Sequence, residues 1–105
     1  MKNILFICNQ NQNRSKTAEE IFKNNFNTKS AGLYNNKPVT FKQISWSDAI
    51  IVMEDKHRSE IAKRFPKEYL KKRILSLEIP DHYKHNDAQL IKSLKSKMEK
   101  YSNLF

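Results

Sequence analysis

Apolar residues follow two different rhythms along this chain. At residues 3–7 and 48–53 they are almost continuous, which is typical of strands buried on both faces of a sheet. At residues 14–26 they recur every three or four positions, which is the pattern of a helix with one buried side. The predicted elements, in chain order, are a strand at 3–7, a helix at 14–26, a strand at 28–33, a turn at 35–38, a less clearly marked short helix within 39–47, a strand at 48–53, a helix at 55–65, a strand at 73–79 and a helix at 86–101.

Strands that alternate with helices predict an α/β fold, in which right-handed crossovers join parallel strands. We expect an open four-stranded parallel sheet with helices on both faces, in a single domain that takes in residues 1–105. Such sheets bind ligands outside the carboxyl ends of their strands. Cys8, Glu54, Asp55 and Asp81 each follow a predicted strand, so we expect them at that edge of the sheet.

The segment from Cys8 to Ser15 carries the strongest functional signal. It contains the only cysteine of the sequence, and five residues separate that cysteine from Arg14. Between a strand and a helix, loop N–H groups and the helix dipole attract an anion. They can stabilise a nucleophilic thiolate, while an arginine fork holds phosphoryl oxygens and a hydroxyl donates to the sulfur. The segment thus favours cysteine-dependent phosphate-ester hydrolysis; the plainer alternative is an inert buried cysteine before a helix cap.

Residues 4–22, with Cys8, Arg14 and Ser15, resemble the low-molecular-weight protein tyrosine phosphatases. Three later stretches look like the same family in the same order: Ser30-Ala31-Gly32 as the end of its second strand, 46–53 as its third strand, and 79–83 as its acid loop. The resemblance implies a phosphatase I-like three-layer architecture, catalysis without a metal or other cofactor, and a cysteinyl-phosphate intermediate.

The resemblance also implies roles for individual residues. Cys8 would be the nucleophile, Arg14 the phosphate clamp and Ser15 the stabiliser of the thiolate. Asn11 matches a loop asparagine whose side chain holds the loop in shape, and asparagine tolerates a left-handed backbone. The loop residues expected to bind phosphate are Asn9, Gln10, Asn11, Gln12 and Asn13.

The chain departs from the family's pattern at four places. Gln10 stands where glycine is usual, and Asn13 stands where many members carry a second cysteine. The stretch between Gly32 and Trp46 is shorter than in typical members, and His82 replaces a proline after the acid. The chain therefore looks like a short, divergent member of the family.

A carboxylic acid must protonate the leaving oxygen of an aryl phosphate. Asp81 is the expected general acid, because it follows the last strand through Pro80 and precedes an aromatic residue. That residue, Tyr83, can line the mouth of the site and stack on an aryl substrate. Asp87 is the alternative acid, although its surroundings also suit the start of a helix.

Histidines add no second site to this sequence. His57, His82 and His85 have no catalytic spacing, and no carboxylate or cysteine completes a metal-binding set around them. We therefore expect surface histidines and no bound metal.

The formal net charge of +9 favours anionic partners. We expect a phosphorylated protein or a small phosphomonoester as substrate, with inorganic phosphate or sulfate able to occupy the loop. No apolar stretch is long enough for a signal peptide or a membrane span, so we expect no membrane partner and a cytoplasmic location, where a lone thiol stays reduced.

Three other functions remain open. A phosphate- or nucleic-acid-binding module without turnover fits the +9 charge and Gln10, although the chain lacks a basic helix with interleaved aromatic residues. A thioredoxin-coupled arsenate reductase needs several cysteines, and this chain has one. A cysteine-phosphorylated carrier of sugar transport has a similar layout, but Arg14 favours hydrolysis over it.

Overall fold

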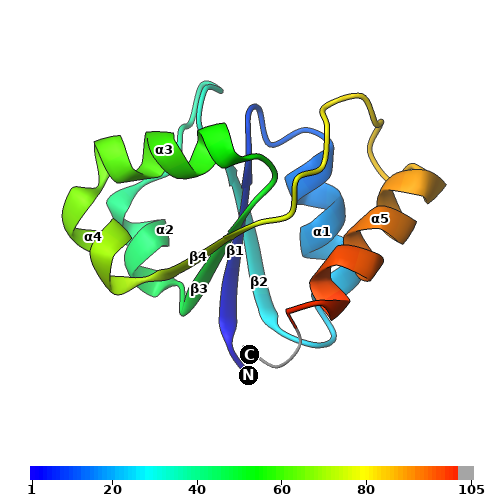
Figure 1. Ribbon diagram of the computed structural model, residues 1–105, viewed down its shortest axis with the longest axis horizontal. Helices are drawn as coiled ribbons and strands as arrows, with labels where there is room; N and C mark the ends of the chain where they lie inside the picture. Colours follow the sequence, from blue (N-terminus) through cyan, green and yellow to red (C-terminus); the bar gives the residue numbers. More distant parts are fainter. Residues whose placement is uncertain (102–105) are drawn as a thin grey trace.

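The computed structural model describes residues 1–101, which form a parallel sheet with helices on both sides (Figure 1). The elements are β1 (Asn3–Cys8), α1 (Arg14–Phe22), β2 (Asn27–Gly32), α2 (Phe41–Trp46), β3 (Ala49–Val52), α3 (Asp55–Arg64), α4 (Pro66–Lys71), β4 (Arg73–Ser76) and α5 (Ala88–Glu99).

The four strands lie in the order β2-β1-β3-β4, and each neighbouring pair is parallel. The expected α/β fold with an open four-stranded parallel sheet is confirmed. The chain passes from β1 to β2 on one side and then crosses to β3 on the other side of β1. Open parallel sheets bind ligands at a switch point of this kind. Cys8 ends β1 at this point, directly opposite Gly32 of β2 in the strand register.

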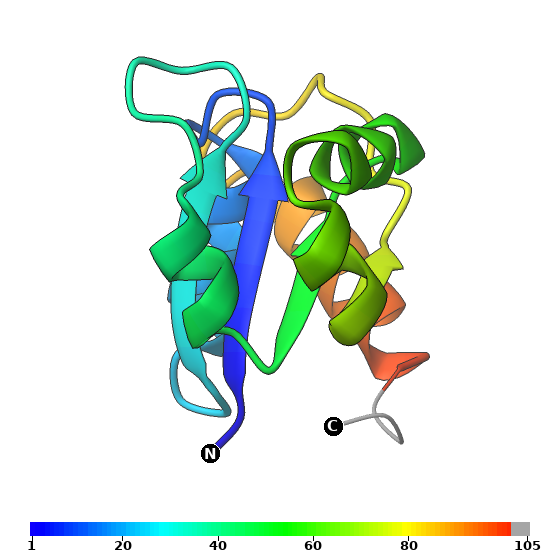
Figure 2. The same ribbon diagram turned by 90° about the vertical axis from the view of Figure 1, so that its left-hand side faces the viewer.

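Two apolar layers hold the sheet because the side chains of β1 alternate between its faces. Ile4, Phe6 and Cys8 belong to a cluster that α1 and α5 cover, whereas Leu5 and Ile7 belong to a cluster that α2 and α3 cover. Figure 2 shows the helices that cover these clusters, with α2 and α3 in front of the strands and α1 and α5 behind them. All five side chains are buried, so β1 is enclosed on both faces as its continuous apolar pattern predicts.

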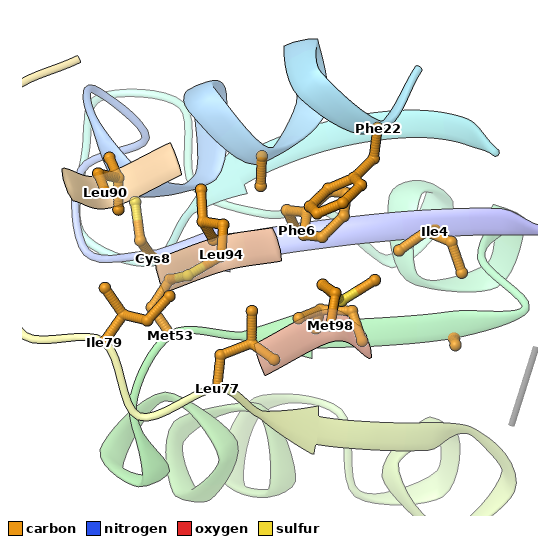
Figure 3. Packing of buried hydrophobic residues seen from close by; sticks show 13 residues of the cluster. Ile4, Phe6, Cys8, Phe22, Met53, Leu77, Ile79, Leu90, Leu94 and Met98 are labelled. Carbon is orange, nitrogen blue, oxygen red and sulfur yellow. The ribbon is translucent and has the colours of Figure 1, made fainter. Parts of the chain in front are cut away.

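Cys8 is part of the core as well as of the loop. In Figure 3 it lies toward one end of the first cluster, and Ile4 lies toward the other. Leu90 and Leu94 of α5 belong to the same cluster. Packing on this side therefore fixes the backbone from which the loop at 9–13 departs.

Several element boundaries differ from the predicted ones. The predicted helix at 14–26 ends at Phe22, whose carbonyl accepts from both Asn25 and Phe26 N–H groups in a closing turn. The predicted strand at 73–79 ends at Ser76, because Glu78 adopts φ 54° and interrupts the extended backbone.

One helical boundary needs correction, and one helix was not predicted. The helix predicted from residue 86 begins at Ala88, since the Asp87 side chain accepts from the N–H groups of the first turn. The residues after Pro66 form a separate helix, α4, with proline at its first position. The short helix expected within 39–47 is confirmed as α2, which begins with a capping box between Thr40 and Gln43.

Across residues 1–101, we find no helix that is both long enough and apolar enough to cross a membrane.

Candidate active site

A small pocket of about 120 Å³ lies at the carboxyl end of β1. The loops that follow β1, β2 and β4 gather at this end of the sheet (Figures 1 and 2). The pocket is lined by Cys8, Asn9, Gln10, Gln12, Asn13, Arg14 and Asp81. A larger hollow of about 480 Å³ between α1 and α5 contains no cysteine, histidine or aspartate, so the chemistry belongs to the smaller pocket.

The sulfur of Cys8 has two polar neighbours although the residue is only 3% exposed. Ser15 Oγ lies 3.0 Å from Sγ, and the backbone N–H of Asn11 donates to Sγ over 3.3 Å. Both groups can donate to a thiolate. The N-cap of α1, Asn13, makes no side-chain hydrogen bond to the helix, so the N–H groups of the first turn remain available to an anion.

Asn11 fixes the shape of the loop. Its φ is 56°, in the left-handed region that asparagine tolerates better than most residues, and its Oδ1 accepts from Ser15 Oγ over 2.7 Å. The Ser15 hydroxyl has one proton. It can therefore donate to Asn11 while accepting from a Cys8 thiol, or donate to a Cys8 thiolate.

Arg14 is buried at 1% exposure and is anchored through one nitrogen. Its Nη1 donates to Glu54 Oε2 over 2.8 Å and to the Ile79 carbonyl over 2.6 Å. Its Nε and Nη2 are buried without a hydrogen-bond partner among residues 1–101. These two nitrogens share one edge of the guanidinium, so their N–H groups can hold two oxygens of one tetrahedral anion.

Glu54 carries two tasks at the amino end of α3. It caps that helix by accepting from the N–H of His57, and its carboxylate holds Arg14. Burial alone would raise the pKa of Glu54, but the hydrogen bond and charge of Arg14, helped by Lys56 and His57, lower it below 4.5. The carboxylate is therefore ionised at neutral pH and compensates the buried charge of Arg14.

The segment after β2 supports the loop from behind. The Asn9 carbonyl accepts from the N–H groups of Leu33 and Tyr34, and Asn35 Nδ2 donates to the Gln10 carbonyl over 3.0 Å. A Cβ at Gly32 would lie 2.9 Å from the carbonyl carbon of Gln10. The single glycine of the sequence thus permits a close backbone approach beneath the pocket.

Among the two candidate acids, only Asp81 lines the pocket. Its Oδ1 lies 3.6 Å from Arg14 Nε, its Oδ2 lies 3.5 Å from Asn9 Nδ2, and its side chain is 51% exposed. Asp87 instead caps α5, accepting from the N–H groups of Gln89 and Leu90.

Tyr83 does not line the pocket, contrary to the expectation from the sequence. Its ring packs against the apolar cluster that α1 and α5 cover, and its centroid lies 4.0 Å from that of His82. Gln10, which stands where the family usually has glycine, does not need a left-handed backbone. The left-handed residue of the loop is Asn11, one position later.

The expectation that all three histidines lie at the surface is wrong for His57. This side chain has no exposed surface. Its Nδ1 accepts from the Glu54 N–H over 3.1 Å, and its Nε2 lies 2.7 Å from Asn9 Oδ1. Burial and the neighbouring charge of Arg14 lower the pKa of His57 from 6.5 to about 4.

Sequence reasoning therefore missed the site roles of Glu54, His57 and Gly32. Glu54 was expected at this edge of the sheet and lies there, but its bond to Arg14 joins residues 40 positions apart. A signal for His57 was present: it follows Glu54 by three positions at the start of a helix, which is the spacing of a capping box.

No protein-family model and no curated protein sequence matches this chain. Solved structures do match it. A low molecular weight protein tyrosine phosphatase from Streptococcus pyogenes has 18% identity and a TM-score of 0.79, covering 100% of this chain and 94% of that one. The tyrosine phosphatase Wzb from Escherichia coli K30, in complex with phosphate, has 19% identity and a TM-score of 0.80, covering 100% and 99%.

A third solved structure is the YwlE arginine phosphatase from Geobacillus stearothermophilus, with 18% identity, a TM-score of 0.75, and coverage of 99% of this chain and 90% of that one. At these low sequence identities the similarity establishes a shared backbone fold, which extends over nearly the whole length of each protein. This chain has the fold of the low-molecular-weight protein tyrosine phosphatases.

Proposed function

We propose that this protein is a metal-independent phosphomonoester hydrolase that works through a phosphoryl group on Cys8. One observation carries the proposal: a single pocket is lined by Cys8, Arg14, Asp81 and every residue of the loop at 9–13 except Asn11. The donor edge of Arg14, formed by Nε and Nη2, has no other hydrogen-bond partner within residues 1–101. A buried guanidinium edge of this kind suits a phosphoryl dianion.

In the first step, the Cys8 thiolate attacks phosphorus in line with the leaving oxygen. A sulfur–phosphorus bond forms, and the bond from phosphorus to the leaving oxygen breaks. Asp81 gives its proton to that oxygen, so the alcohol or phenol leaves neutral. Arg14 and the loop N–H groups hold the equatorial oxygens while their charge redistributes.

In the second step, water attacks the phosphoryl group on Cys8. The Asp81 carboxylate accepts a proton from that water, and the sulfur–phosphorus bond breaks. The departing sulfur regains its negative charge, which Ser15 Oγ at 3.0 Å and the Asn11 N–H at 3.3 Å stabilise. Inorganic phosphate leaves and the enzyme returns to its starting protonation state.

For the substrate, we propose a phosphotyrosyl protein. An acid placed at the pocket suits an aryl leaving group, and the +9 net charge favours an acidic phosphoprotein. The solved neighbours are named as tyrosine phosphatases and as an arginine phosphatase, so a phosphoarginine peptide is the comparison substrate of choice. A reducing compartment such as the cytoplasm would keep Cys8 active.

The test compares wild type, Cys8→Ser and Arg14→Lys on p-nitrophenyl phosphate with EDTA present. We expect EDTA-resistant turnover in wild type and none in Cys8→Ser. Arg14→Lys keeps the charge but loses the planar fork, so its kcat should fall severely. Turnover that survives Cys8→Ser would refute the proposal.

Phosphate binding separates the enzyme from a binding module that lacks turnover. Calorimetry should detect phosphate binding in both wild type and Cys8→Ser. If wild type binds phosphate but hydrolyses neither p-nitrophenyl phosphate, a phosphotyrosyl peptide nor a phosphoarginine peptide, the module without turnover is the better account. Salt-sensitive binding to nucleic acid would support that reading further.

A further inference from the structure

A chain of hydrogen bonds leads from the buried His57 on α3 to the half-exposed Asp81. His57 lies in the first turn of α3, and its Nδ1 accepts from the backbone N–H of Glu54 over 3.1 Å. This nitrogen therefore carries no proton. In the neutral ring the proton sits on Nε2, which donates to Asn9 Oδ1 over 2.7 Å.

The direction of this bond determines how Asn9 is turned. Because the amide oxygen of Asn9 faces His57, its amide nitrogen faces away, and Nδ2 lies 3.5 Å from Asp81 Oδ2. The opposite amide orientation would set N–H against N–H at His57. Glu54 Oε2 is also near Nε2, but at 3.8 Å it is too distant to replace Asn9.

We infer that His57 is a positioning residue, which acts through Asn9 to orient the carboxyl group of Asp81 toward the leaving oxygen. The inference rests on the proposed function, since it needs Asp81 to be the general acid. Burial keeps His57 neutral at physiological pH, so the Nε2–H tautomer persists under assay conditions.

Asp81 needs such a support because its side chain is half exposed and comes from a loop. Arg14 Nε lies 3.6 Å from Oδ1 and Asn9 Nδ2 lies 3.5 Å from Oδ2, so each carboxyl oxygen faces one donor. In the proposed reaction, phosphoryl oxygens occupy the donor edge of Arg14. The contact with Asn9 then becomes the remaining protein contact that fixes the acid, and misplaced catalytic groups react slowly.

Two substitutions of His57 separate positioning from helix capping. In His57→Asn, the side-chain oxygen takes the place of Nδ1, so the acceptor for the Glu54 N–H is kept and the donor to Asn9 is lost. In His57→Gln, the amide nitrogen takes the place of Nε2, so the donor to Asn9 is kept and the capping acceptor is lost. Both variants bury a neutral amide of similar polarity, which makes them matched controls.

The readout is the leaving-group dependence of kcat/KM, because kcat/KM covers the steps up to release of the leaving group and excludes the hydrolysis step that both substrates share. Dinitrophenyl phosphate needs no proton on departure, whereas phenyl phosphate depends on the general acid, which contributes on the order of 10²–10⁴ in rate. We expect the ratio of kcat/KM for dinitrophenyl to phenyl phosphate to rise about tenfold in His57→Asn, a part of that range. The ratio in His57→Gln should stay near wild type.

Asn9→Ala provides a second route if His57→Asn does not fold. It should raise the same ratio, and the double variant should raise it no further, because both changes break one chain. Equal losses of kcat/KM on both substrates in Asn9→Ala and in a folded His57→Asn would overturn the assignment and leave the proposed function standing. Wild type without Cys8-dependent turnover of dinitrophenyl phosphate would overturn both.

Discussion

The Nη1 atom of Arg14 lies 2.8 Å from Glu54 Oε2, which ties the first residue of α1 to the N-cap of α3. The same nitrogen donates to the Ile79 carbonyl, so the anchored side of the guanidinium meets two acceptors from different elements. Anchoring one nitrogen in this way points the opposite edge, Nε and Nη2, at a ligand. Glu54 therefore helps to orient the edge of Arg14 that the proposed mechanism assigns to the phosphoryl group.

Glu54→Gln should weaken catalysis by loosening Arg14. A neutral amide still accepts a hydrogen bond but does not compensate the buried charge, so the loss is about 1.5–3 kcal/mol, or roughly 10- to 150-fold in kcat/KM. Asp55→Asn is the matched control, because the Asp55 side chain is 73% exposed and its ion pair with Arg58 is long, at 3.9 Å. Steady-state kinetics on p-nitrophenyl phosphate measure both; equal effects of the two variants would contradict this role for Glu54.

Gly32→Ala should disturb the loop although it adds a single methyl group. Its Cβ would meet the carbonyl carbon of Gln10 at 2.9 Å, a backbone atom that cannot move without shifting the loop. We expect a loss of about 1–3 kcal/mol in the free energy of unfolding and a drop in kcat. Urea denaturation and kinetics test this, with Lys29→Ala in the exposed part of β2 as control; a fully active, fully stable Gly32→Ala would show that the loop is not tightly packed on β2.

Asn11 can be tested with a pair of variants that divides its backbone role from its side-chain role. Asn11→Ala should lose about 1–2 kcal/mol from left-handed strain at φ 56°, together with the hydrogen bond from Ser15. Asn11→Gly should recover the strain term but not the hydrogen bond. The free energy of unfolding should therefore be larger for Asn11→Gly than for Asn11→Ala, while kcat falls in both variants. If Asn11→Ala were the more stable of the two, the left-handed strain at this position would be refuted.

Stability should fall as the pH drops from 6.5 toward 4. His57 has its pKa lowered from 6.5 to about 4 in the folded protein, so between these values the unfolded chain binds a proton that the folded one does not. The unfolding free energy should then decrease by at most ~1.4 kcal/mol for each pH unit lost. Glu54, with its pKa lowered from 4.5, adds a decrease of the same sign at still lower pH.

Urea denaturation from pH 8 to pH 4, compared with His57→Gln, measures this effect. Glutamine does not titrate, so the variant should show a flatter profile above pH 4.5. Identical profiles for the two proteins would mean that His57 gains its proton as readily in the folded state as in the unfolded chain.

Local sequence signals were sufficient for the fold and for the heart of the candidate site. The continuous apolar runs marked the enclosed strands, and the alternation of strands with helices implied the parallel sheet. Cys8, Arg14 and Ser15 lie within one short segment, so their proximity follows from the strand–loop–helix arrangement. Asp81 was expected at the pocket because parallel strands end at one edge of the sheet, and it lies there.

Contacts between distant segments were beyond the reach of the sequence. The bond from Arg14 to Glu54, the contact of His57 with Asn9 and the approach of Gly32 to Gln10 each depend on how separate loops pack. Tyr83 is the opposite case, a contact that the sequence suggested and the packing does not provide. Its place two residues after Asp81 suggested a substrate contact, but packing on the apolar cluster under α5 takes its ring elsewhere.

Rapid-quench mass spectrometry during turnover of p-nitrophenyl phosphate tests the central claim most directly. Acid quenching within the first turnovers, followed by peptide mapping, should find one added phosphoryl group on the peptide that carries Cys8. Cys8→Ala should form no adduct and show no turnover. Full turnover with no phosphorylated enzyme, or with the phosphoryl group on a residue other than Cys8, would contradict the proposed mechanism.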